Sequence, residues 1–226
     1  AKRLGDRLSE ETRKQRIQTV EAMKESLEST IQSMGEDETP EGETRASKAD
    51  LVDAMNSVAP DAYIVDESIT AKYPLLTRRE MESEGMISNK GGGLGYGLPA
   101  SVGAAIAEGM RENSRDVIGY IGDGSYLYYP QSLYTAARED LDLTVVIPDN
   151  NNYRILKDNT ISMFGGSDED HEYVGMDFDP PVDLVQNARS HGATAKLVET
   201  PIDIEPALQE ALDQHGPTVL DVLVHD

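Results

Sequence analysis

Residues 117–125 have the sequence VIGYIGDGS, in which a mostly apolar run leads directly into a glycine-rich turn. Residues 143–153, LTVVIPDNNNY, have the same arrangement, with an apolar run followed by aspartate and asparagine. Short apolar runs of this kind predict strands that are buried on both faces of a parallel sheet. Because ligands of such sheets bind beyond the carboxyl ends of the strands, we expect the polar residues after both runs to share one site.

The chemistry of these residues indicates a hard cation and a phosphate. Asp123 supplies a carboxylate, Asn150 a side-chain carbonyl and Asn152 a main-chain carbonyl. Mg²⁺ is held in this way, by a few protein oxygens together with water and the phosphate oxygens of its ligand. Gly124 and Ser125 leave the backbone open, so that their N–H groups can face an anion.

The two stretches together resemble the GDG…NN signature of thiamine diphosphate enzymes. Asn150 lies 27 positions after Asp123, a spacing that this family uses. Residues 91–100, GGGLGYGLPA, resemble a segment of the benzoylformate decarboxylase and acetolactate synthase branch. The resemblance covers roughly residues 47–226 and points to the C-terminal, diphosphate-binding domain. Asp149 departs from the commoner pattern, which has Asn there, and its additional carboxylate would either tighten the metal or repel the phosphate.

The resemblance implies thiamine diphosphate and Mg²⁺ as cofactors. It implies that the carbonyl of Gly92 meets the aminopyrimidine ring, and that Leu94 is wedged between the two rings of the cofactor. In the loop after the first strand, Ser68 or Thr70 would contact the cofactor. The full set of implied cofactor-binding residues is Ser68, Gly92, Gly93, Leu94, Gly122, Asp123, Gly124, Ser125, Asn150, Asn152 and Tyr153, with Asp123, Asn150 and Asn152 as the metal ligands.

The resemblance also implies the reaction, the decarboxylation or carboligation of a small 2-oxo acid. In the family the glutamate that activates the cofactor belongs to a separate pyrimidine-binding domain, so we assign no catalytic residue to this chain. We expect that domain as a partner, within a homo- or hetero-oligomer, and we expect the chain to be catalytically silent without it.

The pattern along the chain predicts a helical connector at 1–34, an acidic linker at 35–46 and one domain at 47–226. Apolar residues in the first segment recur at helical spacing, as at Ile17, Val20 and Leu27. In the domain, strands alternate with helices, which predicts an α/β fold with a doubly wound, mostly parallel sheet and helices on both faces. We expect strands at 62–66, 117–121, 143–147, 195–198 and 218–224, and helices at 51–58, from Pro99, at 130–139, 153–157, 184–190 and 204–212.

Two other functions remain open. Gly95, Gly97 and Ala100 satisfy the G-x-G-x-x-A fingerprint of dinucleotide-binding domains, which would make the chain part of an oxidoreductase. That fingerprint must directly follow a strand, and residues 86–90, MISNK, are a poor strand. The chain could also be a non-catalytic assembly module whose first helix carries the interface.

Composition limits the partners. The formal charge is −22, from 42 acidic and 20 basic residues, which makes nucleic acid and anionic membranes poor partners. The excess of acidic side chains indicates either a well-solvated surface or the protein of a halophile, where salt screens their repulsion. The chain has no cysteine, and no apolar run approaches the roughly 20 residues of a transmembrane helix. We therefore expect a cytoplasmic protein.

Overall fold

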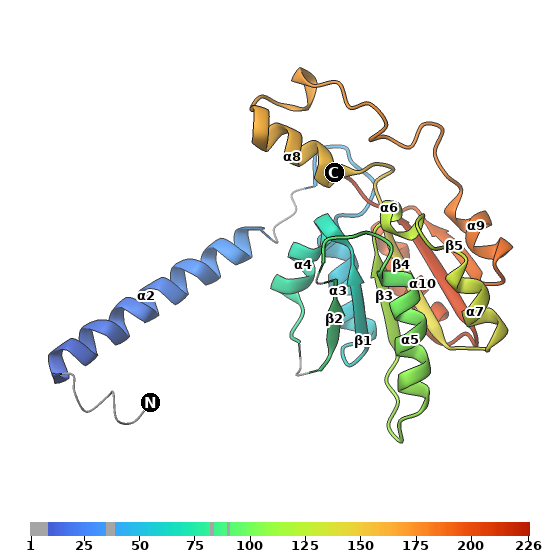
Figure 1. The fold of residues 1–226 in the computed structure, drawn as a ribbon, viewed down its shortest axis with the longest axis horizontal. Coiled ribbons are helices and arrows are strands. Elements are labelled where there is room, and N and C mark those ends of the chain that lie inside the picture. The colour runs from blue at the N-terminus through green and yellow to red at the C-terminus, as the bar shows by residue number, and fades with distance from the viewer. Residues whose placement is uncertain (1–8, 35–38, 82–83, 90) are drawn as a thin grey trace.

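The computed structural model describes residues 9–34, 39–81, 84–89 and 91–226. Their centre is a six-stranded sheet in which all neighbouring strands are parallel, in the order β2-β1-β3-β4-β6-β5 (Figure 1). The strands are β1 (Tyr63–Glu67), β2 (Met86–Ser88), β3 (Val117–Ile121), β4 (Leu143–Asp149), β5 (Thr194–Val198) and β6 (Pro217–Leu223). The sheet confirms the predicted α/β fold with a doubly wound, parallel sheet.

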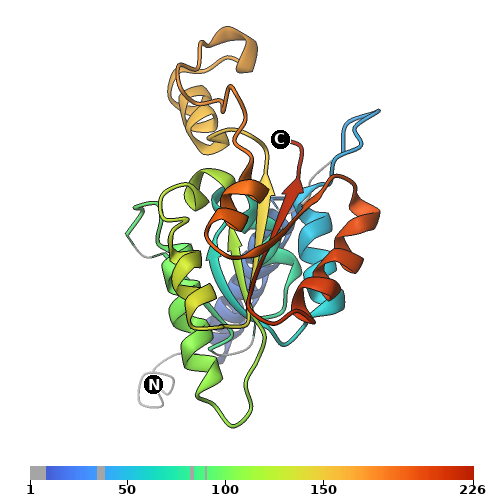
Figure 2. The same ribbon diagram turned by 90° about the vertical axis from the view of Figure 1, so that its right-hand side faces the viewer.

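Helices cover both faces of this sheet (Figure 2). One face carries α3 (Lys48–Val58), α4 (Lys72–Arg78) and α10 (Ile204–Leu212), and the other carries α5 (Gly97–Gly109), α7 (Ser132–Arg138) and α9 (Leu184–Ser190). The remaining helices are α2 (Glu10–Met34), the single turn α6 (Asp123–Tyr126) and α8 (Arg154–Phe164). The short 3₁₀ turns are η1 (Ile69–Ala71), η2 (Asp168–Asp170) and η3 (Pro201–Asp203).

Alternation along the strands builds two separate cores. Because successive side chains of a strand point to opposite faces, Ile64 packs on the face of α3 and Val65 on the face of α5. Val145 and Val146 of β4 divide in the same way. Both faces of the central strands are therefore buried, which explains why their sequences are continuous apolar runs.

One strand was not expected. Residues 86–90 were expected to be a poor strand, but Met86–Ser88 forms β2, which pairs with β1 in the register Ile64 to Met86. The strand lies at the edge of the sheet and needs a partner on one side only, so three residues suffice. Six residues separate its end at Ser88 from Gly95, whereas a dinucleotide fingerprint would require a tight turn there.

Two helices differ from their expected bounds. Helix α5 begins at Gly97, two residues before Pro99, and α8 runs to Phe164 rather than ending near Lys157. The early start of α5 has a physical cause, since the Glu67 carboxylate accepts hydrogen bonds from the main-chain nitrogens of Tyr96 and Gly97.

The N-terminal helix α2 projects away from the sheet (Figure 1). From Ile17 to Leu27 its apolar side chains stay exposed, with Val20 63 % and Leu27 59 % accessible, so this part of the predicted amphipathic stripe is uncovered. The helix approaches the domain at α4. The domain itself begins slightly before the predicted boundary at residue 47. Ala46, which we placed in the linker, is fully buried and donates its main-chain N–H to Leu223 O.

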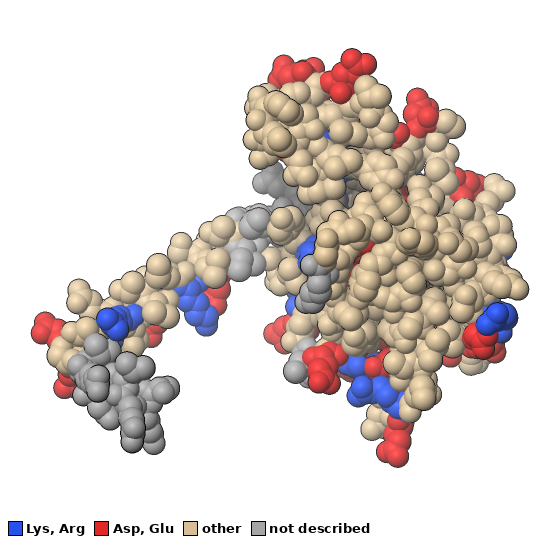
Figure 3. Space-filling model, viewed as in Figure 1, with Lys and Arg blue, Asp and Glu red and all other residues tan. Residues whose placement is uncertain are grey.

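The face seen in Figure 3 has scattered acidic side chains around its edge and a broad uncharged centre. Among the described residues, no helix is both long enough and apolar enough to cross a membrane.

Candidate functional site

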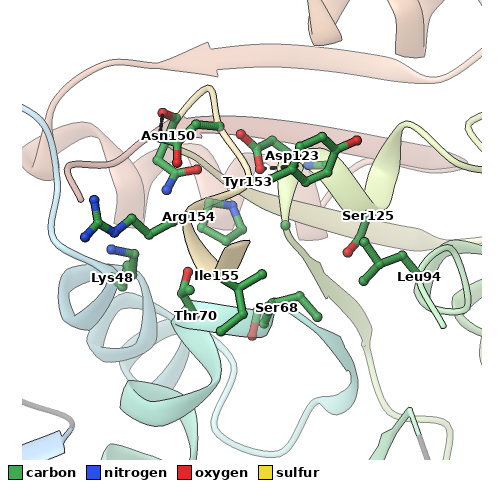
Figure 4. Close-up of a pocket in the computed structure, with 15 residues that line it drawn as sticks. Lys48, Ser68, Thr70, Leu94, Asp123, Ser125, Asn150, Tyr153, Arg154 and Ile155 are labelled. Atoms are coloured by element: carbon green, nitrogen blue, oxygen red, sulfur yellow. Dashed lines mark hydrogen bonds between the residues drawn. The ribbon is translucent and has the colours of Figure 1, made fainter. Parts of the chain in front are cut away.

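A pocket opens beyond the carboxyl ends of β1, β3 and β4, where sequence analysis placed the site (Figure 4). Its cavity measures about 40 Å³, which suits an ion with a few waters or phosphate oxygens but not a whole drug-sized cofactor. Nine of the eleven predicted cofactor residues line it, namely Ser68, Leu94, Gly122, Asp123, Gly124, Ser125, Asn150, Asn152 and Tyr153.

The other two predicted residues, Gly92 and Gly93, do not line the pocket. They lie in an exposed turn that Asn89 closes, because its side chain accepts a 2.7 Å hydrogen bond from Gly91 N and donates to Gly93 O. Gly92 has φ +71°, a conformation that favours glycine. The glycines thus shape the turn, and Leu94 is the part of this run that reaches the pocket.

Asp123 is positioned by the end of β3. Gly122 remains extended, and Asp123 then begins the single turn α6, which places its side chain 95 % buried in the pocket. One carboxylate oxygen, Oδ1, accepts a hydrogen bond of 2.7 Å from Gly124 N. The other, Oδ2, is buried and finds no donor among the described residues. An unpaired buried carboxylate oxygen is what a cation site requires.

Asp149 interacts with two other buried carboxyl groups, those of Asp123 and Asp221. Burial and the neighbouring Asp149 raise the pKa of Asp123 to about 8, and the same two causes raise the pKa of Asp221 on β6 to about 8. Two adjacent carboxyl groups interact favourably only if one holds a proton. Both shifts in pKa favour the protonated form of Asp123 and of Asp221, beside the buried Asp149.

The three asparagines after β4 form a tight turn. Asn151 has φ +57°, a left-handed conformation that asparagine tolerates, and donates its main-chain N–H to Asp149 Oδ1 at 2.8 Å. Asn152 Nδ2 donates to Asn150 O at 2.8 Å, and Asn152 Oδ1 is buried without a partner among the described residues. The turn brings both predicted asparagine ligands to the pocket that Asp123 lines.

Tyr153 covers one wall of the pocket. Its ring lies so close to Gly124 that a Cβ atom built there would sit 2.3 Å from Tyr153 Cε1. The far side of the ring meets Phe178 edge-on, with the centroids 5.0 Å apart. Gly124 is thus required by the approach of Tyr153, a role that sequence analysis did not assign.

Ser68 lies at the pocket, but its hydroxyl donates to Asp66 Oδ1 at 2.7 Å. Asp66 is itself held by Lys72 Nζ at 3.1 Å. The hydroxyl of Ser68 is therefore held by Asp66, and Thr70 also lines the pocket.

Sequence analysis missed two basic residues at the pocket, Lys48 and Arg154, which lie at one end of it (Figure 4). Lys48 is only 8 % exposed and donates to His225 O at 3.0 Å, and Arg154 pairs with Asp158 at 2.7 Å. Each begins a helix, where a positive side chain opposes the helix dipole. A basic residue at the first position of a helix is therefore the sequence feature that could have pointed to Lys48 and Arg154.

The donor set fits Mg²⁺. Among the described residues, no three His, Cys, Asp or Glu side chains come together as a metal cage. One carboxylate with amide and main-chain oxygens is nevertheless the arrangement that Mg²⁺ accepts when phosphate oxygens complete its octahedron. The orphaned oxygens of Asp123 and Asn152 support this assignment.

Several known proteins are similar to this chain in sequence. The model of the family described as thiamine pyrophosphate enzyme, C-terminal TPP binding domain, matches residues 69–222. Benzoylformate decarboxylase of Pseudomonas aeruginosa is 35 % identical over 174 residues, which cover 76 % of this chain and 31 % of that protein. Acetolactate synthase of Bacillus subtilis is 27 % identical over 139 residues, 62 % of this chain and 22 % of that protein.

Solved structures agree with these matches. The thiamine diphosphate-dependent 4-hydroxybenzoylformate decarboxylase of Rhodococcus jostii RHA1 superposes with a TM-score of 0.74 at 30 % identity, over 84 % of this chain and 34 % of that one. The chain thus spans about a third of the length of this relative. On these grounds the chain belongs to the thiamine pyrophosphate enzymes and corresponds to their C-terminal, cofactor-binding domain.

Proposed function

We propose that this chain binds Mg²⁺ and the diphosphate of thiamine diphosphate, as one part of a 2-oxo acid decarboxylase or carboligase. The observation that carries the proposal is the buried, donor-free Asp123 Oδ2 in a pocket that it shares with Asn150 and Asn152. Asp123 would supply the charge on the metal, Asn150 its side-chain oxygen and Asn152 its main-chain oxygen. The main-chain N–H of Ser125, with Lys48 and Arg154, would offset the charge of the phosphates, whereas the Gly124 N–H is held by Asp123 Oδ1.

When bound, thiamine diphosphate supplies a carbon nucleophile and a ring that accepts the electrons released with CO₂. The residues of this chain would hold and orient the cofactor. Leu94 lines the pocket beside Ser125, at the end away from Lys48 (Figure 4). It would support the bend between the two rings, as the family resemblance implies. The described residues that line the pocket include no glutamate, and the group that activates the aminopyrimidine is expected from a pyrimidine-binding domain, as the family resemblance implies.

The surface around the pocket supports such a partner. Several large apolar side chains on α4, directly after α6 and on α8 are exposed by 44–76 %, namely Tyr73, Leu76, Tyr128, Tyr129, Leu156, Met163 and Phe164. Exposed apolar surface of this extent is typical of protein interfaces. The cavity of about 40 Å³ also leaves most of a cofactor outside this chain. We propose that a pyrimidine-binding domain, in the same chain or another subunit, covers this surface and completes the site.

We further propose a cytoplasm of high salt as the setting, which the charge of −22 supports. The functional proposal is tested by assaying CO₂ release from benzoylformate and pyruvate. The chain alone should be silent, and a pyrimidine-binding domain of a related decarboxylase should restore turnover that Asp123→Ala abolishes. Normal turnover by the chain alone would refute the division of labour. NAD binding unaffected by Asp123→Ala would favour an oxidoreductase instead.

A further inference from the structure

Residues 224 and 225 are held on two sides, by Asp149 before the asparagine turn and by residues 46–48. On one side, Val224 N donates to Asp149 O at 2.9 Å. On the other, His225 N donates to Ala46 O at 3.0 Å, and Lys48 Nζ donates to His225 O. Val224 and His225 are 0 % and 1 % exposed. The position of the next side chain, Asp226, is therefore set by the fold.

The Asp226 carboxylate gathers the amide groups of both predicted asparagine ligands. Asn150 Nδ2 donates to Asp226 Oδ1 at 2.5 Å, and Asn152 Nδ2 lies 3.3 Å and 3.2 Å from the two oxygens. Arg154 Nη1 stands 3.8 Å from Oδ2, while the same guanidinium pairs more closely with Asp158 and Asp168. One side chain thus contacts both predicted asparagine ligands, Asn150 and Asn152.

An asparagine side chain carries two donors on its nitrogen and an acceptor on its oxygen. A carboxylate is an acceptor only, so it holds the nitrogen of each amide and leaves the oxygen turned away. Asn152 Oδ1 accordingly remains buried without a partner among the described residues. Without Asp226, the Asn150 amide could rotate and turn its nitrogen, which does not bind a cation, toward the site, whereas the Asn152 amide keeps its bond to Asn150 O.

We propose that Asp226 is a positioning residue for the metal: it fixes the orientation of the Asn150 amide so that its oxygen, not its nitrogen, faces the cation, and it holds the Asn152 side chain beside it. This rests on the proposed function, because it assumes that Mg²⁺ binds at this loop. Groups that orient metal ligands in this way typically change metal affinity by about 10- to 100-fold. Asp226 does not itself touch the metal.

An alternative role for Asp226 predicts the opposite change in cofactor affinity when the residue is removed. Asp226 is a negative side chain, 38 % exposed, beside a site for an anionic phosphate. If it acted mainly by repelling the phosphate, its removal would tighten cofactor binding. The direction of the change in affinity therefore separates positioning from repulsion.

The test compares Asp226→Ala with Asp226→Asn, which removes the charge but keeps an acceptor oxygen. Asp116→Ala removes an exposed aspartate at the opposite end of β3 and serves as the control. In the chain without ligand, ¹H–¹⁵N spectra report the side-chain amides of Asn150 and Asn152 directly. Asp226→Ala should move both signals, and Asp116→Ala should move neither. Unchanged amide signals in Asp226→Ala would overturn the proposal even before any ligand is added.

Mn²⁺ binding, followed by electron paramagnetic resonance in the presence of thiamine diphosphate, gives the second readout. Asp226→Ala should weaken it by about tenfold or more, and Asp226→Asn should recover part of the loss. Tighter binding by Asp226→Ala would overturn positioning in favour of repulsion. If the amide signals move but the unaltered chain shows no metal-dependent binding, the failure lies with the proposed function and not with the orientation of the amides.

Discussion

The carboxylate of Glu67, at the end of β1, accepts a 2.6 Å hydrogen bond from the main-chain nitrogen of Gly97, the first residue of α5. Its other oxygen accepts from Tyr96 N at 3.1 Å. A Cβ atom on Gly97 would lie 2.8 Å from Glu67 Cβ. This contact joins the first strand to the glycine-rich turn at 91–96 and so fixes where Leu94 enters the pocket.

We predict that Glu67→Ala destabilises the fold by about 2–3 kcal/mol, because it leaves one buried and one part-buried main-chain donor without an acceptor at a helix N-terminus. Glu67→Gln keeps one acceptor and should cost about half as much. Urea unfolding measures both. Equal stability of Glu67→Ala and the unaltered chain would show that the contact does not hold α5.

A second prediction concerns the wall of the pocket. Gly124→Ala would place a methyl group against the Tyr153 ring and should destabilise the chain by about 1–3 kcal/mol. In a Tyr153→Ala background the same substitution should have little effect. Unfolding of the four chains gives the coupling energy, expected between about 0.5 and 3 kcal/mol. Additive effects would mean that Tyr153 does not press on Gly124.

Asp149 offers a test of the extra carboxylate. Its presence raises the pKa of Asp123, so a proton competes with the metal for that side chain. Asp149→Asn keeps the acceptor for Asn151 N and removes the charge. We expect it to tighten Mg²⁺-dependent binding of thiamine diphosphate at pH 7 by about three- to tenfold. Weaker binding would instead show that the Asp149 charge attracts the metal.

The pKa of Asp221 predicts how stability depends on pH. Burial and Asp149 raise that pKa to about 8, whereas an unfolded aspartate titrates near 3.9. Between these values the unfolded chain releases the proton and the native chain keeps it. This contribution to stability is therefore complete below about pH 4 and is lost as the pH rises to 8.

Asp221→Asn removes this titration. Its free energy of unfolding should fall less between pH 5 and pH 8 than that of the unaltered chain, by on the order of 1–3 kcal/mol. Urea titrations at the two pH values measure the difference, and Asp213→Asn, at an exposed position, is the control. An identical pH dependence of Asp221→Asn and the unaltered chain would contradict the buried, protonated state.

The sequence was sufficient to predict most of the fold because the signal is local. Apolar runs such as 117–121 and 143–147 are buried on both faces, and the structure confirms strands there. The edge strand β2 escaped prediction because three half-exposed residues carry little periodicity. The clustering of Asp123, Asn150 and Asn152 at the pocket was predictable because the carboxyl ends of parallel strands meet at the same edge of a sheet.

The parts of the site that were missed come from distant segments. Glu67 and Gly97 are 30 positions apart, and Asp226 is 76 positions from Asn150. Their pairing depends on how the strands are ordered in the sheet, which no local pattern contains. Gly92 and Gly93 were placed at the pocket by resemblance alone, and their turn lies at the surface in this chain.

The most direct test is a calorimetric titration of thiamine diphosphate into the chain, in concentrated KCl, with Mg²⁺ and with EDTA. Concentrated salt screens the repulsion among the acidic side chains. Binding should require Mg²⁺ and should be lost in Asp123→Ala and Asn150→Ala, while Asp116→Ala binds normally. Binding that persists in EDTA or in Asp123→Ala, or no binding even when a pyrimidine-binding domain is added, would contradict the assignment of this pocket.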